Sequence, residues 1–373
     1  MIKGIALKGK RTKYLVPKLE SENIAIIDHE DIDRVSGETL VLRGVKAVVN
    51  AASSVSGRYP NLGPGILVDA GIPLYDDAGQ AVFDDLEDGD EIRIEDDGSL
   101  YRGDQLIAQG TPMDKVRLVQ LLTAADRTMD DELEAFVRNT VEYLDKESVA
   151  IIYDPWVPKV DTLVRGRQVL IVVRGYDYKA DLNALKPYIR EVKPVLIGVD
   201  GGADAIIEAG FKPHIIIGDM DSVSDKTLLC GAEIIPHAYE NGECPSALRL
   251  EALGLPVKPW PLSATSEDLA LLLAWEKKAD LIVALGTHSN LVEYLDKGRS
   301  GMASSFLVRL KVGPKLVDAK GVSKLYRAAP PVWQIFGVVA AALVVVGAVF
   351  IVSPPLRQAF SLFWLSIRAQ LGI

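Results

Sequence analysis

The sequence predicts an α/β protein centred on a doubly wound parallel sheet, preceded by a smaller α/β or β-rich domain and followed by a C-terminal transmembrane helix. Three observations lead to this prediction. Between residues 168 and 285, short apolar runs alternate with segments of helical periodicity, as in parallel sheets covered by helices. Two of these runs, 194–199 and 214–217, lead directly into acidic glycine turns. Further along, residues 332–352 contain no charged side chain.

Length and composition limit the classes of protein to consider. The chain has 373 residues, enough for two domains, of which 49% are hydrophobic and 25% charged. The formal net charge of −10, without a basic stripe interleaved with aromatic residues, argues against nucleic acid as a partner. Cys230 and Cys244 are too few for a disulfide framework and lie in no zinc motif, so we expect free thiols. Because no apolar signal segment follows Met1, we expect a cytoplasmic body.

Residues 1–112 predict a small N-terminal domain. The patterns indicate strands at 23–27, 45–50, 91–95 and 99–101, and helices at 31–43 and 66–70. This stretch is loosely similar to the swivelling domains that carry a phosphohistidine between active sites. No histidine lies around Asn61, where that family would need it, and His29 is better explained as a turn or helix-start residue. Arg58 and Asn61 remain candidates for binding an anion or a partner.

Residues 113–150 predict a helical connector. Apolar residues recur at helical spacing from Asp114 to Lys146, which indicates one long helix or a pair. We favour a connector packed against the rest of the chain, because the heptads are not sustained. A dimerising coiled coil, and hence a homodimer, is the alternative.

Residues 151–329 predict the main α/β domain. Its expected strands are 168–173, 194–199, 214–217, 233–236 and 281–285, and its expected helices are 179–191, 267–277 and 302–310. Polar residues follow these strands, and ligands bind at the carboxyl ends of parallel strands. The chain therefore predicts a site at this edge of the sheet.

Two acidic turns carry the chemistry of that site. Asp219 and Asp221, two residues apart, can direct carboxylate oxygens at one hard cation, and Mg²⁺ suits such a pair because phosphate oxygens complete its shell. Glycines allow sharp turns and close approach of the backbone to a phosphate. Near residue 300, a basic glycine turn precedes a helix, which also suits a phosphate. The predicted nucleotide-binding residues are Arg174, Asp200, Gly201, Gly202, Gly218, Ser222, Ser266, Thr287, His288, Lys297, Arg299 and Ser300.

The uncharged segment predicts a membrane anchor at residues 330–352. Its 21 residues from 332 to 352 would span roughly 30 Å as a helix, close to the thickness of a bilayer core. Basic residues predominate before it, which predicts a single-pass C-terminal anchor in the cell membrane with the main body in the cytoplasm. They are Lys315, Lys320, Lys324 and Arg327, against Arg357 and Arg368 after the segment. The amphipathic tail, 353–373, lies either in the membrane interface or against a partner's membrane helix.

The motif pair Asp200-Gly201-Gly202-Ala203 and Gly218-Asp219-Met220-Asp221-Ser222 resembles the catalytic domain of thiamine pyrophosphokinases. That family transfers a pyrophosphoryl group from ATP to a hydroxyl with magnesium, and the resemblance covers residues 168–310. It implies catalytic roles for Asp219, Asp221 and Asp268, with Asp219 and Asp221 as the metal ligands. Only about twenty residues separate Leu310 from the apolar segment, too few for the family's second domain, so thiamine is not the expected acceptor.

The whole layout is similar to the SteA-like cytokinetic ring proteins of bacteria. The similarity rests on the Gly57–Pro64 loop, on Val173–Lys179, on the two acidic turns, on Leu295–Ser304 and on the C-terminal apolar segment. It implies a membrane-tethered protein of cell division or cell separation that acts with an inner-membrane partner protein.

Three functions are therefore compatible with the sequence. The first is a nucleotide-binding regulatory module that holds ATP or another nucleotide with Mg²⁺. The second is an active pyrophosphokinase on another hydroxyl acceptor, such as a pterin or a lipid headgroup, in which Lys297 or Arg299 neutralises the transferred charge. The third is a scaffold without ligand. The paired carboxylates count against the third, because like charges side by side destabilise a fold unless a cation offsets them.

Overall fold

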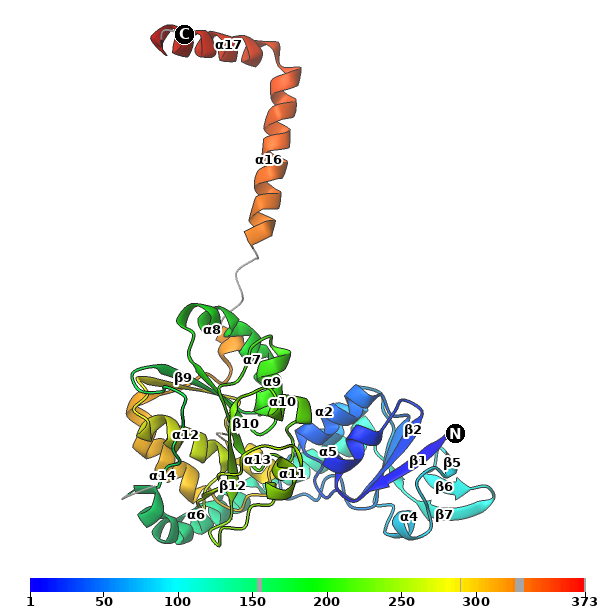
Figure 1. Ribbon diagram of the computed structural model, residues 1–373. Helices are drawn as coiled ribbons and strands as arrows, with labels where there is room; N and C mark the ends of the chain where they lie inside the picture. The colour runs from blue at the N-terminus through cyan, green and yellow to red at the C-terminus, as the bar shows by residue number, and fades with distance from the viewer. Residues whose placement is uncertain (153–155, 289, 326–331, 372–373) are drawn as a thin grey trace.

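The computed structural model describes residues 1–152, 156–288, 290–325 and 332–371. It contains two sheets, each with its own hydrophobic core, joined by two helices (Figure 1). The chain is thus a mixed α/β protein, as the sequence predicts.

The N-terminal sheet has eight strands in the order β7-β6-β5-β1-β2-β3-β4-β8. Strands β1 to β4 are parallel to one another, and β5 to β8 run antiparallel to their neighbours. The sequence did not predict β1, because lysines and glycines alternate with its apolar residues. The strands are β1 (Ile2–Gly9), β2 (Asn23–Ile27), β3 (Ala47–Asn50), β4 (Leu74–Asp76), β5 (Glu91–Ile94), β6 (Ser99–Arg102), β7 (Gln105–Gln109) and β8 (Thr111–Pro112).

Short helices cover this sheet. They are α1 (Thr12–Leu15), the 3-10 turn η1 (Val16–Lys18), α2 (Arg34–Arg43), α3 (Gly63–Asp69) and α4 (Ala81–Asp84). Helix α2 begins three residues later than predicted, because the Asp33 side chain caps it by accepting from the Ser36 N–H. Asp31 instead has a left-handed backbone, φ 53°, and accepts hydrogen bonds from Ser56.

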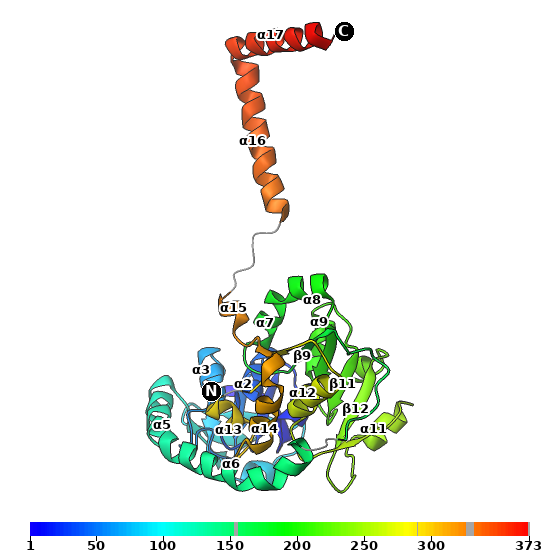
Figure 2. The same ribbon diagram turned by 90° about the vertical axis from the view of Figure 1, so that its left-hand side faces the viewer.

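The connector is a pair of helices, α5 (Lys115–Arg127) and α6 (Met129–Ile152). They break at Thr128, whose hydroxyl donates to the Gly57 carbonyl at 2.7 Å. Helix α6 packs along the second domain, where the rings of Phe136 and Tyr294 lie 5.5 Å apart (Figure 2). A homodimer through this connector stays a prediction.

The second sheet has seven strands, all parallel, in the order β13-β12-β11-β10-β9-β14-β15. Successive residues of the central strands face opposite sides, so that Val169 and Ile171 join one core while Leu170 and Val172 join another. Burial on both faces explains why these strands are continuous apolar runs in the sequence. The strands are β9 (Gln168–Val172), β10 (Val195–Val199), β11 (Ile215–Gly218), β12 (Glu233–Ala238), β13 (Trp260–Pro261), β14 (Leu281–Leu285) and β15 (Leu316–Asp318).

Helices cover both faces of this sheet. One face packs against α12 and α14, and the other against α7, α8 and α9. The helix predicted at 179–191 is in fact two, because Pro187 stands in the first turn of the second. The helices are α7 (Tyr178–Ala184), α8 (Lys186–Val192), α9 (Gly202–Glu208), α10 (Asp225–Leu228), α11 (Ala247–Ala252), α12 (Ser266–Glu276), α13 (Leu291–Asp296), α14 (Ala303–Val312) and the 3-10 turn η2 (Gly313–Lys315).

The chain ends in helices α15 (Val322–Leu325), α16 (Val332–Val352) and α17 (Pro354–Leu371). Helix α16 corresponds to residues 332–352 of the transmembrane segment that was predicted at 330–352. Among the helices within the described ranges, however, none alone has the length and apolarity to cross a membrane. Judged by length and composition alone, the segments Gly337–Val349 and Pro354–Arg368 are long and apolar enough only when they are taken together. They are bent by 99° relative to each other (Figure 1). Arg327 is one of the basic residues from which the orientation of the anchor was predicted, and it lies outside the described residues.

Candidate functional site

A pocket of about 360 Å³ lies at the carboxyl ends of the strands in the second sheet. It brings together ten of the residues that the sequence singled out: Arg174, Asp200, Gly201, Asp219, Asp221, Ser222, Ser266, His288, Lys297 and Arg299. Five do not line it: Gly202, Gly218, Asp268, Thr287 and Ser300. The strand ends therefore converge as the parallel topology requires.

Three of the glycines make room for protein groups rather than for a ligand. Gly218 has φ 140°, and a Cβ there would lie 1.7 Å from Oδ1 of Asp200. A Cβ on Gly202 would lie 2.0 Å from the Val172 carbonyl oxygen, and one on Gly201 would lie 2.7 Å from the Arg174 guanidinium. Gly201 lines the pocket and Gly202 and Gly218 do not, so the approach of these two glycines to a phosphate stays a prediction. They let the site's own strands and carboxylate pack closely.

Asp200 is held in an environment that disfavours its charge. Its backbone is left-handed, with φ 47°. Although the residue is partly exposed, its Oδ1 is buried and has no hydrogen-bond partner among the described residues. Burial and the nearby charge of Asp219 raise the pKa of Asp200 to about 7. A cation next to this carboxylate would relieve both effects.

Asp219 and Asp221 project from an exposed loop whose shape is fixed by hydrogen bonds. The Asp221 N–H donates to Oδ1 of Asp219 at 3.0 Å, and Met220 between them has φ 63°. Arg249 donates to the carbonyl oxygens of Met220 and Val223, each at 2.6 Å. These contacts keep the two carboxylates on the pocket side of the loop.

Cationic side chains line the same pocket. Arg174 follows β9 and lies 3.5 Å from Oδ2 of Asp204, while Lys297 and Arg299 come from the turn before α14. Ser300, in the same turn, lines a smaller neighbouring pocket with Arg299. The pocket thus combines the carboxylates of Asp200, Asp219, Asp221 and Glu267 with three cations from this domain.

His288 lines the pocket through a buried ion-pair network. Its Nδ1 lies 3.0 Å from Oε2 of Glu267, and Arg309 lies 3.3 Å from the other carboxylate oxygen. Burial opposes ionisation of Glu267, but the hydrogen bond from His288 and the charge of Arg309 outweigh it and lower the pKa of Glu267. His288 is therefore positioned by a carboxylate that stays charged near neutral pH.

Asp268 does not line the pocket, and the catalytic role that the resemblance implied for it stays a prediction. It is fully buried in the first turn of α12, where it forms a capping box with Thr265. Its Oδ2 accepts from the hydroxyls of Ser304 and Ser305 at 2.9 and 3.0 Å. Burial and the charge of Glu267 raise the pKa of Asp268. The acid of this turn that lines the pocket is Glu267.

We expect Asp268→Asn to reduce stability and leave ligand affinity unchanged. The amide loses a charge-assisted acceptor that holds α12 to α14, which costs about 2 kcal/mol. Denaturant unfolding checks this, with the exposed Asp219→Asn variant as a control that should unfold like the wild type. Unchanged stability together with lost nucleotide binding would support the catalytic assignment of Asp268 instead.

The sequence missed two residues that the N-terminal domain contributes to the pocket. Lys13 of α1 and Val35 of α2 line it, and Lys13 Nζ lies 3.2 Å from Oδ2 of Asp221. No local pattern marks either residue, because the contact joins positions 208 apart in the chain.

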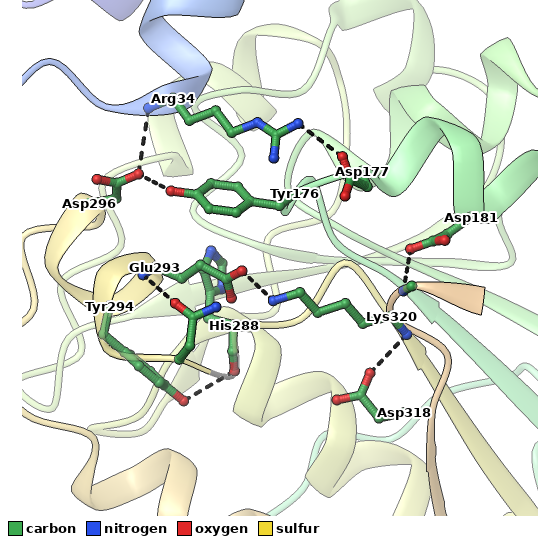
Figure 3. Close-up of polar contacts among 12 residues, drawn as sticks. Arg34, Tyr176, Asp177, Asp181, His288, Glu293, Tyr294, Asp296, Asp318 and Lys320 are labelled. Carbon is green, nitrogen blue, oxygen red and sulfur yellow. Dashed lines mark hydrogen bonds and ion pairs between the residues drawn. The ribbon is translucent and has the colours of Figure 1, made fainter. Parts of the chain in front are cut away.

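A polar network beside the pocket joins the two domains and the C-terminal segment (Figure 3). Arg34 donates to Asp177 at 2.9 Å, and the Tyr176 hydroxyl donates to Asp296, whose pKa burial raises. On the other side, Lys320 pairs with the buried Glu293. Asp181 accepts from the Gly321 N–H at 2.8 Å and from the Ser323 N–H at 2.9 Å, which fixes the start of α15.

Fold and pocket together define a parallel α/β domain with a mixed carboxylate and cation site at its strand ends. The C-terminal end matches a known family: residues 320–369 match the SteA-like C-terminal domain, so the chain carries that domain. Over 88 residues the chain is 33% identical to the 6-hydroxymethyl-7,8-dihydropterin pyrophosphokinase of Methanocaldococcus jannaschii. That alignment covers 22% of this chain and 36% of the relative, so the chain spans only about a third of that protein's length. Both resemblances drawn from the sequence are thereby supported.

Two solved thiamine pyrophosphokinase structures are also similar, one from Bacillus subtilis and one from Geobacillus thermodenitrificans. Each is 24% identical, and the matches cover 41% and 40% of this chain and 59% of each of those chains. The TM-score is 0.26 in both cases, so this likeness carries no conclusion about function.

Proposed function

We propose that the protein is a nucleotide-binding regulatory module attached to the bacterial cell membrane, which acts with Mg²⁺ and with an inner-membrane partner protein in cell division or cell separation. We infer the nucleotide site from the residues that line the pocket. It holds Asp200, Asp219 and Asp221 together with Arg174, Lys297 and Arg299. Paired carboxylates suit a hard cation, and the basic groups suit the phosphates that such a cation accompanies.

The residues present fit magnesium in a limited way. Among the described residues, no group of three or more His, Cys, Asp or Glu side chains is arranged to hold a metal ion by itself. Mg²⁺ commonly takes only one or two carboxylates and completes its shell with phosphate and water. Asp219 and Asp221 would hold it, and the buried, partnerless Oδ1 of Asp200 adds negative potential beside them. Bound there, the ion would neutralise phosphate charge.

The attachment to the membrane rests on the C-terminal helices. Helix α16 is strongly apolar, and its exposed side chains from Val338 to Val349 have no charge among them. The SteA-like domain match covers this helix. The proposed role in division rests on the resemblance of the sequence to the SteA-like cytokinetic ring proteins. Lys315, Lys320 and Lys324 precede α16, which favours a body on the cytoplasmic side.

We expect the full chain to sediment with membranes, and a chain ending at residue 325 to be recovered in the soluble fraction. The two forms differ by residues 326–373, which include the apolar helices α16 and α17. Carbonate extraction separates insertion from surface adsorption. A truncated chain that still sediments with membranes would place the attachment elsewhere.

A pyrophosphokinase is the second candidate, favoured by the 33% identity to a pterin pyrophosphokinase. In that case the chain would transfer a pyrophosphoryl group from ATP to a hydroxyl and release AMP. Lys297 and Arg299 line the pocket and would neutralise charge on the transferred group.

One experiment separates these functions. ATP and GTP are titrated with Mg²⁺ into the full chain in detergent micelles, and the mixture is then chromatographed for AMP with and without a hydroxymethylpterin acceptor. Binding without AMP supports the regulatory module, whereas AMP that depends on the acceptor supports the pyrophosphokinase. No binding of either nucleotide leaves a scaffold and overturns both proposals.

A further inference from the structure

The N-terminal domain places a cation inside the pocket of the second domain. Lys13 lies on α1, and its ammonium group pairs with Asp221 at 3.2 Å while its side chain stays half exposed. Burial lowers the pKa of Lys13, but the hydrogen bonds and charge interactions with Asp221 and Tyr14 together outweigh it, so the pKa is raised and the ammonium stays charged. The pocket's other cations, Arg174, Lys297 and Arg299, all come from the second domain.

Lys13 is held at this position by the interface between the domains. Arg34 at the start of α2 bonds to Asp177 at 2.9 Å, and its guanidinium lies 4.6 Å from the centre of the Tyr176 ring. Helix α1 is tied to the loop before α2, because the Thr12 hydroxyl lies 2.9 Å from Nδ1 of His29. Only Gly175 separates Tyr176 and Asp177 from Arg174 of the pocket, so the interface and the pocket share one loop.

We propose that Lys13 binds the phosphates of the ligand, so that a nucleotide in this pocket bridges the N-terminal domain and the α/β domain. This inference rests on the proposed nucleotide site. The physical reason is competition at Asp221. A metal ion held by that carboxylate would take the place of the Lys13 ammonium, which could then pair with the phosphates that the ion accompanies. A lysine on a flexible stem can make this change without a shift of the backbone.

The test uses the full chain in detergent micelles, with ATP and Mg²⁺ as the probe. We expect Lys13→Met to weaken binding about tenfold, the effect of losing one charge-assisted hydrogen bond at a partly exposed site. Lys13→Arg keeps the charge and should bind within about threefold of the wild type. Lys18→Met is the matched control, because Lys18 is an exposed lysine five residues on that does not line the pocket.

A second measurement separates direct contact from a charge effect through Asp221. Hydrogen exchange of residues 12–18 is followed with and without ATP and Mg²⁺. A bridging ligand should slow exchange there in the wild type and not in Lys13→Met. Wild-type affinity in Lys13→Met, or no slowing of exchange in the wild type, overturns the bridging role and leaves the nucleotide site in place. If the wild type binds no ATP, the proposed function fails, and the bridging role with it.

Discussion

Replacing Asp219 and Asp221 together by asparagine is expected to abolish Mg²⁺-dependent nucleotide binding while the protein stays folded. Both side chains are exposed on the pocket loop, so their substitution changes stability by less than about 0.5 kcal/mol. An asparagine at 219 still accepts the hydrogen bond from the Asp221 N–H, so the loop keeps its shape. The cation loses both charged ligands, and we expect affinity to fall at least about 100-fold, or about 3 kcal/mol.

Calorimetric titration of ATP with Mg²⁺ measures the effect, and thermal unfolding confirms the fold. Asp225→Asn is the matched control: Asp225 lies four residues beyond Asp221, pairs with Arg249 on the surface and does not line the pocket. It should bind like the wild type. Undiminished binding in the double variant would remove the metal role of the two carboxylates.

Asp200→Asn is expected to stabilise the ligand-free protein at alkaline pH. The pKa of Asp200 is about 7 in the folded chain and near 4 in the unfolded chain, so the folded state binds the proton more tightly. Stability therefore falls as pH rises from about 4 to about 7, and the full penalty is present above that. Asparagine is neutral, of the same shape, and tolerates the left-handed backbone. Each pKa unit corresponds to about 1.4 kcal/mol, so we expect a gain of a few kcal/mol at pH 8.

The measurement is denaturant unfolding with EDTA at pH 4.5 and pH 8. The gain should be present at pH 8 and small at pH 4.5, where Asp200 is protonated in the wild type. Asp204→Asn is a control in which stability should change in the opposite direction. The Asp204 carboxylate accepts hydrogen bonds from the hydroxyls of Ser224 and Thr227 at 2.6 and 2.5 Å, so its charge is stabilised by partners. This variant should be less stable at pH 8. Equal stability of Asp200→Asn and the wild type at both pH values would contradict the shifted pKa.

Much of the fold was predictable because runs of apolar residues in the sequence indicate which strands are buried. Strands β9, β10, β11 and β14 are buried on both faces, and each is a run of apolar residues in the sequence. Strand β1 was missed for the converse reason: Lys3, Gly4 and Lys8 break its apolar pattern, and its pairing with β2 and β5 depends on residues far along the chain. Two predictions failed on local chemistry, since Pro187 divides a helix and Asp33 rather than Asp31 begins α2.

The site was predictable to the extent that strand ends determine it. Parallel topology alone brings the ends of β9, β10 and β11 to one edge, and with them Arg174, Asp200 and the Asp219–Asp221 pair. Asp268 and Glu267 are adjacent in sequence, and only their packing separates them. Asp268 turns inward to Ser304 and Ser305, whereas Glu267 faces the pocket.

By itself, the sequence determined the α/β class, the strands that carry the pocket, the acidic turns and the apolar C-terminal segment. These follow from short-range patterns of polarity, glycine and charge, which need only a few neighbouring residues. The tertiary structure alone decided which acid of residues 267–268 faces the pocket, the raised pKa of Asp200, and the arrival of Lys13 at Asp221. Each of these depends on burial or on a contact between residues that are far apart in the sequence. A pattern of a few neighbouring residues contains no information about either.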